Sequence, residues 1–253
     1  MLAFNTIRMY LFVLIAFFIA FNVHAAKLDE VQRLKLAYPD NIKEITPSYI
    51  TWKDGTRMLI RSPVPFADLI SSHIYHINKA LGSISKKDVI RDRYEPFFRK
   101  MYGSTAEEVK KHLVTIYWMP KVFGKRYPLR VTAINGIDKK LQHISSELEK
   151  LPPAYLKFVT NPAGAFYWRN VSHENYLSTH SFGIAVDINS HYTNYWLWDH
   201  EKSHKPVSEL GHHNQVPQRI VEIFEKEGFF WGGRWRFYDT MHFEYRPEFF
   251  IPT

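Results

Sequence analysis

The chain has 253 residues, of which 45% are hydrophobic, and it contains no cysteine. Such a composition supplies ample apolar side chains for a packed core and excludes a fold stabilised by disulfide bonds. The 33 basic and 25 acidic residues give a formal net charge of +8, but they form neither a basic block nor a known nucleic-acid motif, so we expect no nucleic-acid partner.

The first 25 residues have the organisation of a signal peptide. Arg8 precedes the apolar run MYLFVLIAFFIAF, and Val23 and Ala25 stand where signal peptidases accept small residues. The run is shorter than the ~20 residues that a membrane-spanning helix needs, and no cysteine follows it to mark a lipoprotein. We therefore predict removal of residues 1–25, no stable membrane insertion afterwards, and a periplasmic or cell-wall location. An uncleaved membrane anchor is the alternative.

The exported part of the chain is also basic. Arg8 is the only Lys, Arg, Asp or Glu among residues 1–25, so the remaining residues carry a net charge of +7. This charge suits an anionic partner such as a cell wall or a membrane surface. Solubility alone explains it equally well.

The N-terminal part shows two elements of different kinds. Residues 27–36 are predicted to form a short helix, with Leu28, Val31 and Leu34 on one side. Residues 49–60 are predicted to form a hairpin, with Asp54-Gly55 at its turn.

A further helix is predicted to start at Ser104, because Ser104 and Glu107 have the spacing of a capping box. From these elements we predict an N-terminal helical extension over residues 26–112, packed on a catalytic domain over residues 113–253.

The catalytic part mixes strands and helices. Residues 129–134 show the alternation of side-chain polarity that is typical of a strand, and the turn signal Asn135-Gly136 follows them. Helices are predicted over residues 137–150 and 217–227, and a short strand over 241–245. The predicted strands and helices do not follow a repeated βαβ order, so we predict an α+β fold with a small central antiparallel sheet flanked by helices.

The segment STHSFGIAVDIN, residues 178–189, carries the first candidate functional residues. From Gly183 onward the alternation places bulky apolar side chains on one face of a strand and small residues around Asp187 on the other. A carboxylate in such a strand is costly unless it is paired or bound to a metal. His180, seven residues earlier, is the candidate partner.

A second group lies in the segment DTMHFEY, residues 239–245. His242 and Glu244 share one face of the predicted strand, and Asp239 lies in the turn before it. Two histidines and a carboxylate, with a fourth position left for water, are typical of a catalytic zinc site. Asp239 is well placed to take a proton from that water.

Geometry restricts this hypothesis. Ligand atoms about 2 Å from one metal lie only some 3 to 4 Å from each other, whereas seven extended residues span roughly 23 Å. His180 and Asp187 can therefore share a metal only if the chain bends between them, and Gly183 is a residue that tolerates a bend.

Several alternatives remain open from the residues alone. His180 could be a hydrogen-bonded structural histidine, Asp187 the partner of a buried cation, Asp239 a turn residue and Glu244 a salt-bridge partner. A serine triad is disfavoured, because the chain contains no G-x-S-x-G elbow. His200, His204, His212 and His213 lie in a polar, loop-like region, where solvated histidines are expected rather than a second metal.

The first segment resembles a known family of enzymes. It matches the pattern S-x-H-x-x-G-x-A-x-D of the zinc D-alanyl-D-alanine carboxypeptidases of the VanY type and of the L-alanyl-D-glutamate endopeptidases. DTMHFE resembles the second motif of that family, an acidic residue three positions before the last histidine ligand. These enzymes share the hedgehog-like metallopeptidase fold, so the resemblance implies a zinc site carried on the predicted sheet.

The resemblance implies a role for each candidate residue. His180, Asp187 and His242 would bind one Zn2+ per chain, and Asp239 would be the catalytic base. Ser178 would hold substrate, and Arg169 would face the scissile carbonyl or a substrate carboxylate. Some relatives carry His-x-His at the second motif; this chain has Glu244 at the second histidine position, which makes Glu244 a support for His242 rather than a ligand.

Together these observations predict a monomeric, exported zinc peptidase that cleaves peptidoglycan stem peptides. The rival hypothesis is a non-catalytic wall-binding module that keeps a structural zinc, since the fold alone does not fix the function.

Overall fold

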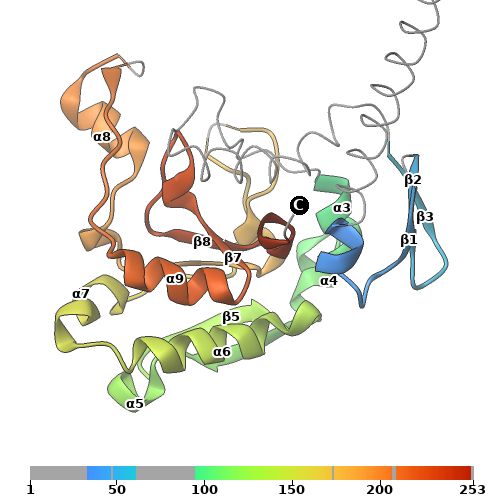
Figure 1. Ribbon diagram of the computed structural model, residues 1–253, viewed down its shortest axis with the longest axis horizontal. Coiled ribbons are helices and arrows are strands. Elements are labelled where there is room, and N and C mark those ends of the chain that lie inside the picture. Colours follow the sequence, from blue (N-terminus) through green and yellow to red (C-terminus); the bar gives the residue numbers. More distant parts are fainter. Residues whose placement is uncertain (1–32, 47, 61–94, 173, 207–208, 252–253) are drawn as a thin grey trace, which may run out of the picture. The chain divides into compact units, whose positions relative to one another are not determined.

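The computed structural model describes residues 33–46, 48–60, 95–172, 174–206 and 209–251. These described residues divide into two compact units, one that reaches residue 60 and includes residue 251, and one that runs from residue 95 to residue 250 (Figure 1). The expected signal peptide lies outside the described residues, as does most of the helix expected over 27–36. The last part of that helix is present, because residues 33–37 are helical and Leu34 is buried.

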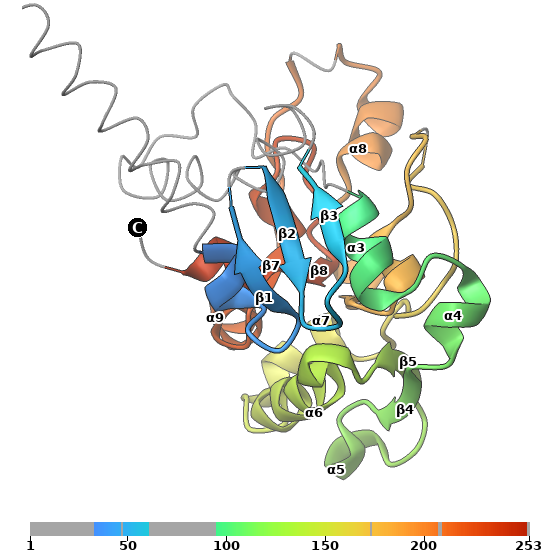
Figure 2. The same cartoon turned by 90° about the vertical axis from the view of Figure 1, so that its right-hand side faces the viewer.

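The first unit contains a three-stranded antiparallel sheet, which Figure 2 shows face on. Its strands β1 (Ile42–Ile45), β2 (Tyr49–Trp52) and β3 (Arg57–Leu59) are adjacent in chain order. The hairpin predicted around Asp54-Gly55 is confirmed, since β2 pairs with β3 and Gly55 has a φ of 84°. Residues 42–59 thus form a small sheet that contains the predicted hairpin.

The second unit begins its described part with two helices, α3 (Glu95–Tyr102) and α4 (Ala106–Lys110). The cap of α4 lies one residue later than predicted. The Thr105 hydroxyl accepts a hydrogen bond from the Glu108 N–H, and the Glu108 carboxylate accepts one from the Ser104 N–H. Both helices lie in the same compact unit as the residues of the candidate site.

The strands β4 (Leu113–Tyr117) and β5 (Pro128–Thr132) form an antiparallel pair. The helix α6 (Ile137–Leu148) lies against both strands. Its four apolar residues predicted to share one face are all fully buried: Ile137, Leu141, Ile144 and Leu148. Shorter helices connect these elements: α5 (Pro120–Phe123), α7 (Leu156–Val159) and α8 (Trp196–Ser203).

A second small sheet in this unit has the strand order β6-β8-β7 and is antiparallel throughout. Its strands are β6 (Ala185–Asp187), β7 (Phe229–Trp231) and β8 (His242–Tyr245). The helix α9 (Gln218–Lys226) lies between this sheet and α6 (Figure 1). Its Phe224 ring stacks on Phe243 of β8 with ring centres 3.8 Å apart, which fixes the central strand of the sheet against the helix.

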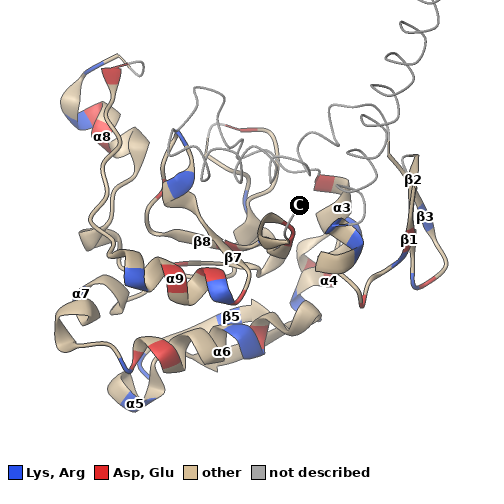
Figure 3. Cartoon of the chain, in the orientation of Figure 1, with Lys and Arg blue, Asp and Glu red and all other residues tan. Residues whose placement is uncertain are grey.

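The α+β class predicted from the sequence is confirmed, with helices packed on small antiparallel sheets. Acidic and basic residues both lie along α6 and α9 (Figure 3); Lys140 pairs with Glu227, which directly follows α9, and Arg219 pairs with Glu222. Within the described ranges, no helix combines the length and apolar character needed to cross a bilayer.

Candidate metal centre

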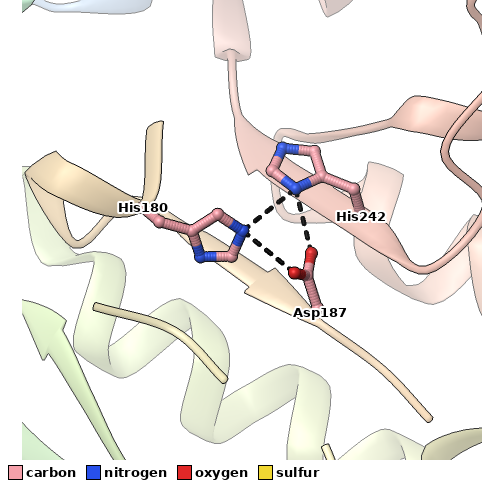
Figure 4. Close-up of side chains that lie close together, drawn as sticks. All are labelled: His180, Asp187 and His242. Carbon is pink, nitrogen blue, oxygen red and sulfur yellow. Dashed lines mark hydrogen bonds and ion pairs between the residues drawn. The ribbon is translucent and has the colours of Figure 1, made fainter. Parts of the chain in front are cut away.

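Three side chains converge in the second unit, as Figure 4 shows. The His180 Nε2 atom lies 3.1 Å from Asp187 Oδ2 and 3.2 Å from His242 Nδ1. The His242 Nδ1 atom lies 3.0 Å from Asp187 Oδ1. These separations are those of donor atoms around a single metal ion. The sequence-based prediction that the two motifs meet is confirmed, and the three residues form a group that could hold a metal.

Strand pairing brings the two motifs together. β6 and β8 are antiparallel neighbours, and Asp187 is the register partner of His242. Directly opposed residues in such a pair have Cβ atoms about 4.5–5.5 Å apart, which suits a carboxylate and an imidazole that share a metal. His180 precedes β6 in the 3-10 turn η3 (Thr179–Phe182).

The bend required between His180 and Asp187 occurs at Gly183. This residue has a φ of 68° and ends η3 in the left-handed conformation. A Cβ atom here would lie 2.6 Å from Leu113 Cδ2 and 3.0 Å from the Thr132 backbone nitrogen. Glycine is therefore needed for both its backbone conformation and its lack of a side chain.

The second nitrogen of each imidazole has its own partner. His180 Nδ1 lies 2.5 Å from the Ala165 carbonyl oxygen. His242 Nε2 lies 3.1 Å from Glu244 Oε2 and 3.3 Å from Thr179 Oγ1. Such contacts fix the ring orientation and leave the facing nitrogen for a metal.

Burial and charge act in opposite directions on the titration of the cluster. Burial alone would raise the pKa of Asp187, but the facing imidazoles of His180 and His242 outweigh it and hold the pKa well below its usual range. Burial alone would lower the pKa of His242, whereas its hydrogen bonds with Asp187 and Glu244 raise it to about 9. The acidic groups thus favour a positive charge at this position, which either a proton or a metal ion can provide.

The donor set fits a zinc ion with an open position. Two imidazole nitrogens and one carboxylate are zinc ligands, and catalytic zinc sites use three protein ligands with a fourth position for water. The Asp187 side chain keeps 18% of its surface exposed, whereas His180 and His242 keep 5% each. The sequence predicted a strand face of small residues around Asp187. Ala185 on that face is fully buried, so solvent reaches the strand at its Asp187 end.

Asp239 lies just before β8, three residues from His242. Its backbone carbonyl accepts a hydrogen bond from the His242 N–H, and its N–H donates to the Gly232 carbonyl. Tyr195 forms an isolated antiparallel β-bridge with it. The residue is largely buried, so these contacts fix its backbone directly beside a candidate ligand.

Ser178 and Arg169 lie on adjacent segments next to His180. The Ser178 hydroxyl accepts a hydrogen bond from the His180 N–H and caps η3, and Ser178 is 4% exposed. The Ser178 N–H donates to the Arg169 carbonyl at 2.9 Å, and the exposed Arg169 guanidinium donates to the Asn170 carbonyl. These contacts give Ser178 a structural role at the site.

Sequence reasoning missed two side chains of this site. Thr179 donates to Glu244 Oε2 at 2.9 Å, but it occupies a variable position of the first motif and gave no signal. Arg246 donates to Glu244 Oε1 at 3.1 Å. The sequence could have indicated Arg246, because His242, Glu244 and Arg246 are spaced by two residues and therefore share one face of an extended chain.

The histidines of the polar region do not join a second metal group of the described residues. His200 Nδ1 lies 2.7 Å from the Lys205 carbonyl oxygen, and His213 Nδ1 lies 3.0 Å from Asp199 Oδ2. His212 Nε2 lies 2.6 Å from the Gly233 carbonyl oxygen. Each of the three therefore has a separate partner.

Comparison with known proteins gives one family. Residues 172–245 match the model of a peptidase family described as D-alanyl-D-alanine carboxypeptidase. No curated protein and no solved structure gives a significant match to the chain. The matched segment contains His180, Asp187, Asp239 and His242, and it confirms the resemblance predicted from the two motifs: residues 172–245 carry the signature of the D-alanyl-D-alanine carboxypeptidase family.

Proposed function

We propose that the protein is an exported, monomeric zinc peptidase that hydrolyses a peptide bond in peptidoglycan stem peptides. The family match supports a peptidase that acts on peptidoglycan. The observation that carries the finer proposal is the convergence of His180, Asp187 and His242, with donor atoms 3.0–3.2 Å apart. The bond cleaved is of the D,D-carboxypeptidase or the L-alanyl-D-glutamate endopeptidase type.

In this proposal one Zn2+ is held by His180 Nε2, His242 Nδ1 and the Asp187 carboxylate. When bound, zinc acidifies a coordinated water and polarises the scissile carbonyl. The protein holds its ligands in advance, because the Ala165 carbonyl and Glu244 each fix one imidazole. Preformed ligand geometry lowers the cost of assembling the site.

Asp239 is proposed as the general base. Its carboxylate would take the proton of the attacking water and pass it to the leaving amine. The hydrogen bond from the His242 N–H to the Asp239 carbonyl supports this role, because it ties the position of the base to that of a ligand. Glu244 is 1% exposed, which favours Asp239 over Glu244 as the base.

Arg169 and Ser178 are proposed to contact substrate. The exposed guanidinium of Arg169, which donates to the Asn170 carbonyl, could turn toward the substrate carboxylate or the scissile carbonyl, where it would stabilise developing negative charge. Ser178 is better supported as a cap that positions His180, so a substrate contact by its hydroxyl requires a change of partner.

The second candidate function is a wall-binding module that retains a structural zinc. Structural zinc sites in proteins are closed by four protein ligands, whereas the group found among the described residues has three members. A structural site also has no need of an acidic residue fixed beside a ligand. Both observations favour the enzyme.

Export is proposed from residues 1–25, with cleavage after Ala25. N-terminal sequencing of protein from the exported fraction tests it. An intact Met1 on membrane-embedded protein would instead establish the anchored form.

Mass spectrometry of purified peptidoglycan digested with the mature protein tests the activity. We expect release of D-alanine, or of fragments cut between L-alanine and D-glutamate, and no release after zinc is removed with a chelator. Stoichiometric zinc without any cleavage would instead establish the binding module.

A further inference from the structure

A row of buried charged side chains leads from His242 away from the metal centre. His242 Nε2 lies 3.1 Å from Glu244 Oε2, and Glu244 Oε1 lies 3.1 Å from Arg246 Nη1. Arg246 Nε then lies 2.5 Å from Glu248 Oε1. The row connects a candidate ligand to the segment that follows β8.

Glu244, Arg246 and Glu248 are each 1% exposed. Buried ion pairs are weak contributors to stability, and apolar residues of similar volume are often at least as stabilising. Stability alone therefore does not explain why three charged residues occupy this position.

The two oxygens of Glu244 have different partners. Its Oε2 atom faces His242 Nε2 and accepts a hydrogen bond from Thr179, whereas its Oε1 atom accepts one from Arg246. A planar guanidinium restricts the orientation of the carboxylate that it contacts. Arg246 thereby selects the rotation of Glu244 that presents Oε2 to the imidazole.

Arg246 is itself held from several sides. Its guanidinium carbon lies 5.3 Å from the centre of the Phe98 ring and 4.3 Å from that of Phe249, and cations are attracted to aromatic faces at such distances. Its backbone N–H donates to the Gly228 carbonyl at 2.9 Å. The anchor of the row is thus rigid.

We propose that Arg246 is a positioning residue of the metal centre. It holds Glu244 so that this carboxylate accepts a hydrogen bond from His242 Nε2, which directs His242 Nδ1 at the metal and strengthens it as a ligand. Arg246 touches neither substrate nor metal. This inference rests on the metal centre of the proposed function but not on its peptidase activity.

The test compares the full mature protein with its Arg246→Met variant. Zinc affinity is measured by competition with a chromophoric chelator, and ligand geometry by the visible absorption of the cobalt(II)-substituted protein. Because loss of such supporting contacts costs about 10–100-fold in metal affinity, we expect a loss in that range together with a changed cobalt spectrum.

Arg234→Met is the matched control. Arg234 makes a two-point contact with Glu225 on α9, at 2.6 and 2.8 Å, so this variant also loses a guanidinium–carboxylate pair. We expect it to lower the melting temperature while zinc affinity stays within twofold of wild type. An equal loss of zinc affinity in both variants would assign the effect of Arg246 to general stability and overturn the proposal.

Unchanged zinc affinity and an unchanged cobalt spectrum in folded Arg246→Met would also overturn it. If that variant does not fold, the Glu248→Gln variant is the deciding test. It removes the charged partner of Arg246 Nε but retains both Glu244 and Arg246. A severalfold loss of zinc affinity supports the proposal, and wild-type affinity overturns it. A wild type that binds zinc without cleaving stem peptides refutes the peptidase alone, whereas a wild type that binds no zinc refutes both.

Discussion

The molecule contains two groups of histidines with opposite behaviour. In the candidate metal centre, His180 and His242 are buried and point nitrogen atoms at each other and at Asp187. In the polar region, His200 and His213 point at separate partners, the Lys205 carbonyl and Asp199. Histidine density alone is therefore a poor guide to a metal site, and convergence of donor atoms is the better one.

The physical cause of the difference is the backbone that carries each group. His180 and His242 are fixed by a tight turn and by the pairing of β6 with β8. His200 and His204 have i, i+4 spacing, which places side chains on one helix face. However, α8 ends at Ser203, and His204 adopts a left-handed conformation with a φ of 55°, so His204 lies beyond the helix to which that spacing rule applies.

The largest expected effect is the difference in zinc content between variants of the two histidine groups. His180→Ala and Asp187→Ala should lose most of their zinc on exhaustive dialysis, because each removes one of three ligands, and peptidase activity should disappear with it. His213→Ala should keep near-stoichiometric zinc. Metal analysis of the dialysed proteins measures this, and full retention of zinc by His180→Ala would refute the ligand assignment.

The Asp239→Ala variant distinguishes a general-base role of Asp239 from a role as a metal ligand. Loss of a general base costs about 100- to 10,000-fold in rate, so activity in a stem-peptide assay should fall by that factor while zinc and fold remain. Should the variant shed its zinc, Asp239 is a ligand and Glu244 becomes the next candidate for the base. Wild-type activity would refute the catalytic role of the second motif.

Zinc affinity should depend on pH in a direction set by His242. Its hydrogen bonds with Asp187 and Glu244 overcome burial and raise its pKa to about 9 in the absence of metal. Below that pH the imidazole carries a proton that zinc must displace. Apparent affinity should therefore weaken as pH falls, by up to about tenfold per pH unit for one displaced proton. Chelator competition between pH 6 and 9 measures the slope, and a flat profile would contradict the proton release.

The smallest expected effect concerns the bend between His180 and Asp187. Gly183→Ala forces a left-handed conformation on alanine, at a cost of about 1–2 kcal/mol, and places a Cβ atom against Leu113 and Thr132. Gly136→Ala is the control, because Gly136 has a similar φ of 66° but nothing within 4 Å of the added atom. In urea unfolding, Gly183→Ala should be the more destabilised variant and should also bind zinc more weakly. Equal effects of the two substitutions would show that close packing at Gly183 is unimportant.

Local patterns predicted several elements correctly. The apolar spacing of α6 and α9, the Asp54-Gly55 hairpin and the shared face of His242 and Glu244 all follow from short-range periodicity, and the structure contains each of them. Where two local solutions were equally good, the sequence could not choose between them. Ser104 and Thr105 can both cap a helix, and the register with Thr105 and Glu108 is the one formed.

The sequence by itself determined which residues are the candidates for the chemistry, because the two motifs place histidines and carboxylates at fixed intervals and require a glycine between His180 and Asp187. Only the tertiary structure decided how these residues meet. The register that opposes Asp187 to His242 depends on the pairing of strands some fifty residues apart, and the Ala165 carbonyl that contacts the His180 imidazole comes from a separate segment, 15 residues earlier in the chain. Such contacts form when the whole unit packs, and no local period in the chain encodes them.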